Sequence, residues 1–121
     1  METTPKEIRS YVTREKKVPF REWFYSLEDE PTQAAIDARI ARLRLGLIGH
    51  ARSVGGGVQE LKIDFGPGYR VYFGQEGETL VILLCDGSKR TQRQDIKQAK
   101  EYWQDYQVRV AAVRKEREEK K

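Results

Sequence analysis

The chain has 121 residues, of which 23 are Lys or Arg and 19 are Asp or Glu, so the formal net charge is +4 and the pI is about 9.2. With 38% hydrophobic and 35% charged residues, it is predicted to form one domain with a small core and a charged surface. The single cysteine, Cys85, excludes an intramolecular disulfide and a cysteine-based zinc site. Residues 80–85 form the longest apolar run, and no signal-peptide pattern opens the chain. We therefore expect a soluble, cytoplasmic protein with no membrane partner.

The N-terminal third of the chain predicts a strand followed by two helices. Residues 8–13 alternate between apolar and polar side chains, which is typical of a short strand at a sheet edge. Two apolar stripes at helical spacing then predict a helical hairpin, whose first helix opens at Pro19 and breaks at residues 29–31. The stripes comprise Phe20, Trp23, Phe24 and Leu27, and then Ile36, Ile40, Leu43 and Leu47.

A glycine-rich stretch runs from Gly46 to Gly57. Its five glycines suit neither a helix nor a strand interior, so a mobile loop is predicted. The stretch contains His50, the only histidine of the chain. We interpret His50 as a surface loop residue, because no second His or Cys is available to share a metal ion with it.

Two alternating segments, residues 58–65 and 69–73, flank Gly66-Pro67-Gly68 and predict a β-hairpin. A three-residue loop pairs Phe65 with Tyr69, which places Lys62 opposite Tyr72 and Asp64 opposite Arg70. In this register one face of the hairpin is apolar. The other face is expected to be exposed, and it carries Glu60, Lys62, Asp64, Arg70 and Tyr72.

The last part of the chain predicts a buried strand and a long helix. Residues 79–85 are apolar on both faces, which indicates the central, covered strand of the sheet. Thr91 and Gln94 match a capping box, and the helix that follows is expected to reach about Arg117, with residues 115–121 frayed. Its apolar residues have the a/d spacing of a packed seam. They are Ile96, Ala99, Trp103, Tyr106, Val110 and Val113.

The predicted order of elements is strand, helix, helix, three strands, helix. This order indicates an α+β fold with a mostly antiparallel sheet, an N-terminal helical hairpin and a long C-terminal helix. We expect a single domain over residues 1–121, with a core over about residues 8–106 and a C-terminal extension over about 107–121.

Basic residues follow the buried strand and adjoin the polar face of the hairpin. They predict a groove that binds the phosphates of a nucleic acid, because Arg binds phosphate in a bidentate manner and Lys supplies a point charge. Tyr72 can stack on an unpaired base. An ordinary solvated sheet face with cross-strand charge pairs remains the alternative. No metal-ligand cluster or nucleotide-binding glycine pattern is present in the sequence, so no metal and no cofactor is expected. The residues that adjoin the hairpin are Lys89, Arg90, Gln92 and Arg93.

Several of these motifs occur together in one known group of proteins. The motifs are Gly57-Val58, Glu60-Leu61-Lys62, Gly66-Pro67-Gly68-Tyr69-Arg70-Val71-Tyr72-Phe73, Lys89, Thr91-Gln92 and Asp95-Ile96. They resemble toxins of the RelE/ParE superfamily, in particular the HigB-like branch of addiction module killer proteins. The helical hairpin and the glycine-rich stretch are similar to the same family, so the resemblance covers roughly residues 11–106.

The resemblance implies the toxin of a type II toxin-antitoxin system, an mRNA endonuclease (mRNA interferase) that acts at the ribosome. In such enzymes the RNA 2′-hydroxyl attacks the adjacent phosphate without a metal ion. By position, Lys62 and Arg70 would contact the scissile phosphate and Lys89 would add positive charge. Tyr72 would stack on a base or aid proton transfer, and Glu60 is a possible base.

The resemblance also implies partners and leaves alternatives. The expected partners are mRNA, the ribosome and a cognate antitoxin of the helix-turn-helix type, with Arg90, Gln92 and Arg93 as RNA-binding residues. For Gln92 and Asp95, a structural role at the start of the helix is the alternative. Two other functions stay open: a ParE-like inhibitor of DNA gyrase that cleaves nothing, and an inactive, phage-derived interaction protein. Of these, the basic residues favour cleavage.

Overall fold

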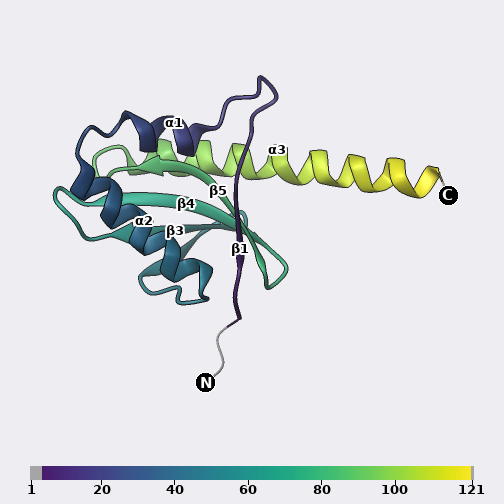
Figure 1. Ribbon diagram of the computed structural model, residues 1–121. Coiled ribbons are helices and arrows are strands. Elements are labelled where there is room, and N and C mark those ends of the chain that lie inside the picture. Colours follow the sequence, from purple (N-terminus) through teal and green to yellow (C-terminus); the bar gives the residue numbers. More distant parts are fainter. Residues whose placement is uncertain (1–3, 121) are drawn as a thin grey trace.

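The computed structural model describes residues 4–120, which form a mixed five-stranded sheet and three helices (Figure 1). The predicted α+β class is confirmed, and one strand is added to the predicted order. In chain order the elements are β1 (Glu7–Ser10), α1 (Pro19–Ser26), α2 (Glu30–Arg44), β2 (Ala51–Gly55), β3 (Val58–Ile63), β4 (Tyr69–Glu76), β5 (Leu80–Gly87) and α3 (Gln92–Glu119).

The strands lie in the order β1-β5-β4-β3-β2. The β1 strand is at the edge, as predicted, and it pairs with β5 in parallel, whereas all other neighbours are antiparallel. The middle position belongs to β4, so the prediction that residues 79–85 form the central strand is wrong. These residues are nevertheless covered on both faces, because Val81 and Leu83 face one core and Ile82 and Leu84 the other.

Each face of the sheet has its own core. On one face, α1 and α2 contribute Phe20, Ile36, Ile40 and Leu43, which pack against Leu61, Val71 and Phe73. On the other face, Ala99 and Trp103 of α3 cover Val58, Tyr72 and Leu84. The sheet is therefore the middle of three layers.

The second half of the predicted loop over Gly46–Gly57 is the edge strand β2, so the prediction of a mobile loop is wrong there. This strand pairs with β3 through Ala51 and Leu61 and through Arg52 and Glu60. The glycines lie outside or at the end of β2, and Gly55, Gly56 and Gly57 all have positive φ in the turn that leads into β3. They make the tight reversal possible, because glycine adopts positive φ without steric cost.

The hairpin of β3 and β4 is shifted by two residues from the predicted register. Ile63 pairs with Tyr69, Lys62 with Arg70, and Glu60 with Tyr72, so the expected pairs of Lys62 with Tyr72 and of Asp64 with Arg70 are wrong. Residues 64–68 form the loop, which is closed by backbone hydrogen bonds from Phe65 to Ile63 and from Gly68 to Phe65. A shift by two preserves the face of every side chain, because the strand period is two.

The polar face of the hairpin is partly buried, contrary to the prediction. Tyr72 is 0% and Glu60 4% exposed, whereas Lys62 and Asp64 remain exposed. The cause is α3, because Ala99 and Trp103 pack in the same core as Tyr72, and Gln92 donates a hydrogen bond to Glu60. The Trp103 ring also packs closely on Gly57 and Gly74, where a Cβ atom would overlap it.

The predicted capping box does not form at the start of α3. Asp95 replaces it: its carboxylate accepts hydrogen bonds from the backbone N–H of Ser88 and from the hydroxyl of Thr91. At the other end α3 is helical to Glu119, so most of the residues predicted to be frayed are ordered. The seam is buried at Ala99 and Trp103, but Val113 is 47% exposed because α3 has by then extended past the sheet (Figure 1). Within the described part of the chain, no helix is both long and apolar enough to cross a membrane.

We expect Gly74→Ala to lower the free energy of unfolding by about 2–3 kcal/mol, because a Cβ at this position would overlap the ring of Trp103. Urea denaturation followed by circular dichroism measures this loss. In a Trp103→Leu background, the same glycine substitution should cost far less. Equal costs in the two backgrounds would show that the contact is not the reason for the glycine.

Candidate functional site

Three of the predicted phosphate-binding residues line one pocket of about 380 Å³. Lys62 comes from β3, Arg70 from β4, and Lys89 from the turn between β5 and α3. The loop over residues 64–68 forms the rest of the wall. Arg90 and Arg93 are exposed but do not line this pocket, so the structure brings together only part of the predicted basic set.

A second pocket of about 420 Å³ adjoins the first, since Lys62 and Arg70 line both. Its other walls include His50, Arg52, Glu60 and Gln92. We call the two pockets together the basic cleft. It lies where the β3–β4 hairpin meets the start of α3.

The buried carboxylate of Glu60 forms the floor of the basic cleft. Its Oε1 accepts a hydrogen bond from Arg52 Nε at 3.0 Å and lies 3.4 Å from Arg70 Nε. Its Oε2 accepts hydrogen bonds from the Tyr72 hydroxyl at 2.8 Å and from Gln92 Nε2 at 2.9 Å. Both oxygens are thus occupied by side chains from β2, β4 and α3.

This environment sets the protonation of Glu60 and Tyr72. Burial alone would raise the pKa of Glu60, but hydrogen bonds from Arg52, Tyr72 and Gln92 outweigh it and hold the pKa below its ordinary value. Burial and the neighbouring Glu60 carboxylate raise the pKa of Tyr72 well above its ordinary value. Glu60 is therefore ionised and Tyr72 neutral at pH 7.

Two roles implied by the family resemblance do not fit this geometry. Tyr72 lies under α3 and has no free ring face on which a base can stack. Glu60 has both oxygens engaged and a lowered pKa, which makes it a poor proton acceptor. Glu60 instead holds the guanidinium group of Arg52 by a hydrogen bond, and Tyr72 donates a hydrogen bond to Glu60.

Gln92 and Asp95, for which a structural role at the start of the helix was the alternative, both make contacts that hold this part of α3 in place. Gln92 donates to Glu60, and Asp95 accepts from residues that precede α3. Gly87, at the end of β5, lies close to Tyr72 of β4 and to Asp95 of α3, because a Cβ atom at this position would overlap both side chains. These contacts fix the first turn of α3 beside the basic cleft.

The sequence interpretation missed two residues of the cleft. Arg52 was overlooked because β2 was not predicted: Ala51-Arg52-Ser53-Val54 has two adjacent polar residues and no period-two alternation. His50 is exposed, as predicted for a surface residue, but it also lines the cleft beside Lys62 and Arg70. Over residues 4–120, no three His, Cys, Asp or Glu side chains come together as a metal site.

The fold and the cleft together define a small α+β protein with a basic cleft at one end of its sheet. No protein-family model matches the chain. The chain is 51% identical over 81 residues to an uncharacterized protein of Haemophilus influenzae, an alignment that covers 67% of this chain and 82% of that protein. It therefore belongs to the same family as that protein.

We expect Glu60→Gln to lower the free energy of unfolding at pH 7 by about 3 kcal/mol, because it removes the charge that compensates the largely buried Arg70. The pKa of Glu60 is lower in the folded than in the unfolded chain, so its contribution is full above the ordinary pKa of 4.5 and is lost as the pH falls through the folded value. The difference between the variant and the wild type should therefore shrink in acid. Urea denaturation at pH 7 and pH 3 measures both effects.

Asp64→Asn is the matched control, because Asp64 is exposed and its single ion pair among the described residues, 3.7 Å from the Lys62 ammonium, is a weak surface contact. It should change the free energy of unfolding by less than about 0.5 kcal/mol. A Glu60→Gln protein as stable as this control would contradict the central role of the Glu60 carboxylate.

Proposed function

We propose that this protein is the toxin of a type II toxin-antitoxin system, a cytoplasmic, ribosome-dependent endoribonuclease that cuts mRNA without a metal ion. The observation that carries the proposal is the convergence of Lys62, Arg70 and Lys89 on one pocket, although they come from separate segments of the chain. Phosphate is the ligand that such a set of cations suits best. The family resemblance of the same residues supports this assignment.

Arg70 is the residue best suited to stabilise the transition state. Its side chain is only 13% exposed, and its Nε atom lies 3.4 Å from the Glu60 carboxylate. A charge that is held in place before the reaction stabilises developing negative charge better than a mobile surface charge does. Lys62 and Lys89, both exposed, bind the flanking backbone.

The reaction needs a group that moves protons, and we assign this role to His50. Histidine suits it because its ordinary pKa is near neutral. His50 shares its pocket with Lys62 and Arg70. The 2′-hydroxyl oxygen bonds to phosphorus as its proton passes to the imidazole, and the bond to the 5′ oxygen breaks. The leaving 5′ oxygen takes a proton from solvent water, and the imidazolium returns its proton to the solvent, which gives a cyclic phosphate and a 5′-hydroxyl.

The partners that follow from this proposal are mRNA on the ribosome and a cognate antitoxin of the helix-turn-helix type. The positive charge of the cleft supplies affinity for the RNA backbone without sequence information. Arg90 and Arg93, exposed next to the cleft, extend the basic surface along which RNA would run. Glu60 and Tyr72 act through Arg70 and do not touch the substrate.

We expect Lys89→Ala and Arg70→Ala to abolish growth inhibition and message cleavage on induction, because each removes a charge from the phosphate site. Mapping of message 5′ ends after induction measures cleavage, and circular dichroism confirms the fold. Lys97→Ala is the control, since Lys97 is exposed on α3 and does not line the cleft. Intact messages accompanied by DNA breaks on induction of the wild type would instead indicate a gyrase inhibitor.

We expect His50→Gln to lower kcat for cleavage by about 10²- to 10⁴-fold while leaving RNA affinity within about twofold, because it removes a proton carrier but no phosphate contact. Single-turnover cleavage on programmed ribosomes measures the rate. Filter binding of the same message measures the affinity. An unchanged rate in this variant would exclude His50 from proton transfer.

A further inference from the structure

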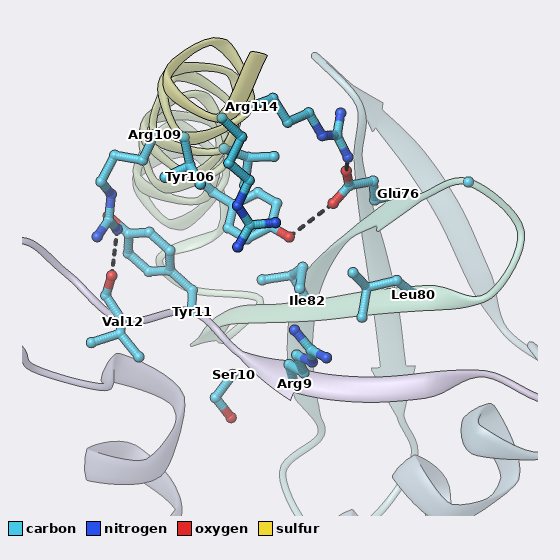
Figure 2. Close-up of a pocket in the computed structure, with 14 residues that line it drawn as sticks. Arg9, Ser10, Tyr11, Val12, Glu76, Leu80, Ile82, Tyr106, Arg109 and Arg114 are labelled. Carbon is cyan, nitrogen blue, oxygen red and sulfur yellow. Dashed lines mark hydrogen bonds and ion pairs between the residues drawn. The ribbon is translucent and has the colours of Figure 1, made fainter. Parts of the chain in front are cut away.

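A long groove lies where α3 leaves the sheet, between this helix and the edge formed by β1 and β5 (Figure 2). It measures about 940 Å³ and shares no lining residue with the basic cleft. In Figure 2 the side chains of Tyr106, Arg109 and Arg114 point from α3 toward the strands below. The groove is therefore a separate feature of the molecule.

The groove combines an aliphatic lining with a basic rim. Val12, Leu80, Ile82, Val110 and Val113 supply the aliphatic surface, of which Val12 is 43% and Val113 47% exposed. Clusters of exposed aliphatic side chains rimmed by polar residues mark protein interaction sites. This part of the surface is thus shaped to bury apolar side chains.

The rim of the groove is predominantly positive. Arg9, Arg109, Arg114 and Arg117 all line it, whereas Glu76 is its single acidic lining residue. Glu76 already accepts a hydrogen bond from the Tyr106 hydroxyl and an ion pair from Arg114. Arg9 and Arg109 also form ion pairs, with Glu7 and Asp105, so a ligand carboxylate would have to exchange with these partners. Arg117 is the rim arginine to which the described residues give no ion pair, and it is the first partner that an acidic ligand would meet.

The last turns of α3 form one wall of the groove. Residues of the helix beyond Tyr106 are largely exposed, although Val110 and Val113 continue its apolar seam. A helix gains most of its stability from packing of an apolar face. The last turns of α3 therefore offer half of an interface.

We propose that this groove binds an acidic, amphipathic segment of another protein. Apolar side chains of the segment fill the space between Val12 and Val113, and its Asp or Glu residues pair with the arginines of the rim. The chemistry favours a protein over a nucleic acid, because a sugar–phosphate backbone has no aliphatic side chains to bury against valine and leucine. The proposal does not depend on the nuclease function, since the two sites lie at opposite ends of β4.

The test uses the full chain and a panel of fluorescent helical peptides with Leu on one face and Glu on the other. Fluorescence anisotropy measures their affinity, and the same peptides with Lys in place of Glu serve as probes of charge. Two variants disable the groove: Val113→Asp in the lining and Arg117→Glu on the rim. Val108→Asp and Lys115→Glu are the matched controls, because both residues are exposed on α3 but do not line the groove.

We expect saturable binding of an acidic peptide that weakens about tenfold or more in each groove variant, is unchanged in the two controls, and is absent for the Lys peptides. Failure of every acidic peptide to bind, or equal losses in groove and control variants, would overturn the proposal. Two further measurements test other occupants of the groove. Light scattering shows whether the free protein is a dimer, and a dimer that Val113→Asp dissociates would assign the groove to a second copy of the chain. Single-stranded RNA that competes with the peptide would assign the groove to RNA, and either result would also overturn the proposal.

Discussion

The carboxylate of Glu60 is the interaction on which the rest of the structure depends. It is almost completely buried, and a buried carboxylate without partners would destabilise the fold by several kcal/mol. The partners come from β2, β4 and α3, so one charged group joins three elements to β3. Arg70, 3.4 Å from this carboxylate, is one of the residues that line both pockets of the basic cleft.

Strand alternation predicts the faces of β3 and β4 correctly even though the register is off by two residues. The reason is that a shift by two leaves every side chain on the same face, whereas the register itself is set by the loop over residues 64–68, whose hydrogen bonds the sequence does not reveal. The burial of Tyr72 was not predictable from its strand, because a segment that begins twenty residues later covers it. The sequence reflects the packing of α3 on the sheet only at Gly57 and Gly74, two glycines that contact Trp103 and leave room for its ring.

Candidate site residues were predictable where they lie on the predicted hairpin or on the turn that follows the buried strand. Lys62, Arg70 and Lys89 meet because hairpin and turn geometry bring them to one end of the sheet. Arg52 and His50 depend on β2, an irregular edge strand with glycines on both sides and too few apolar residues for a strand signal. An edge strand needs fewer apolar residues than a central one, so composition describes it poorly.

The parallel pairing of β1 with β5 has a consequence for folding during synthesis. The β1 strand can pair only after residues 80–83 have been made, and Tyr11, just beyond it, donates to Asp105, a residue 94 positions later. Contacts that are so distant in sequence form late, because a long loop must close before they add stability. We therefore expect β1 to leave the ribosome before β5 and to join the sheet only after β5 and the start of α3 have been made.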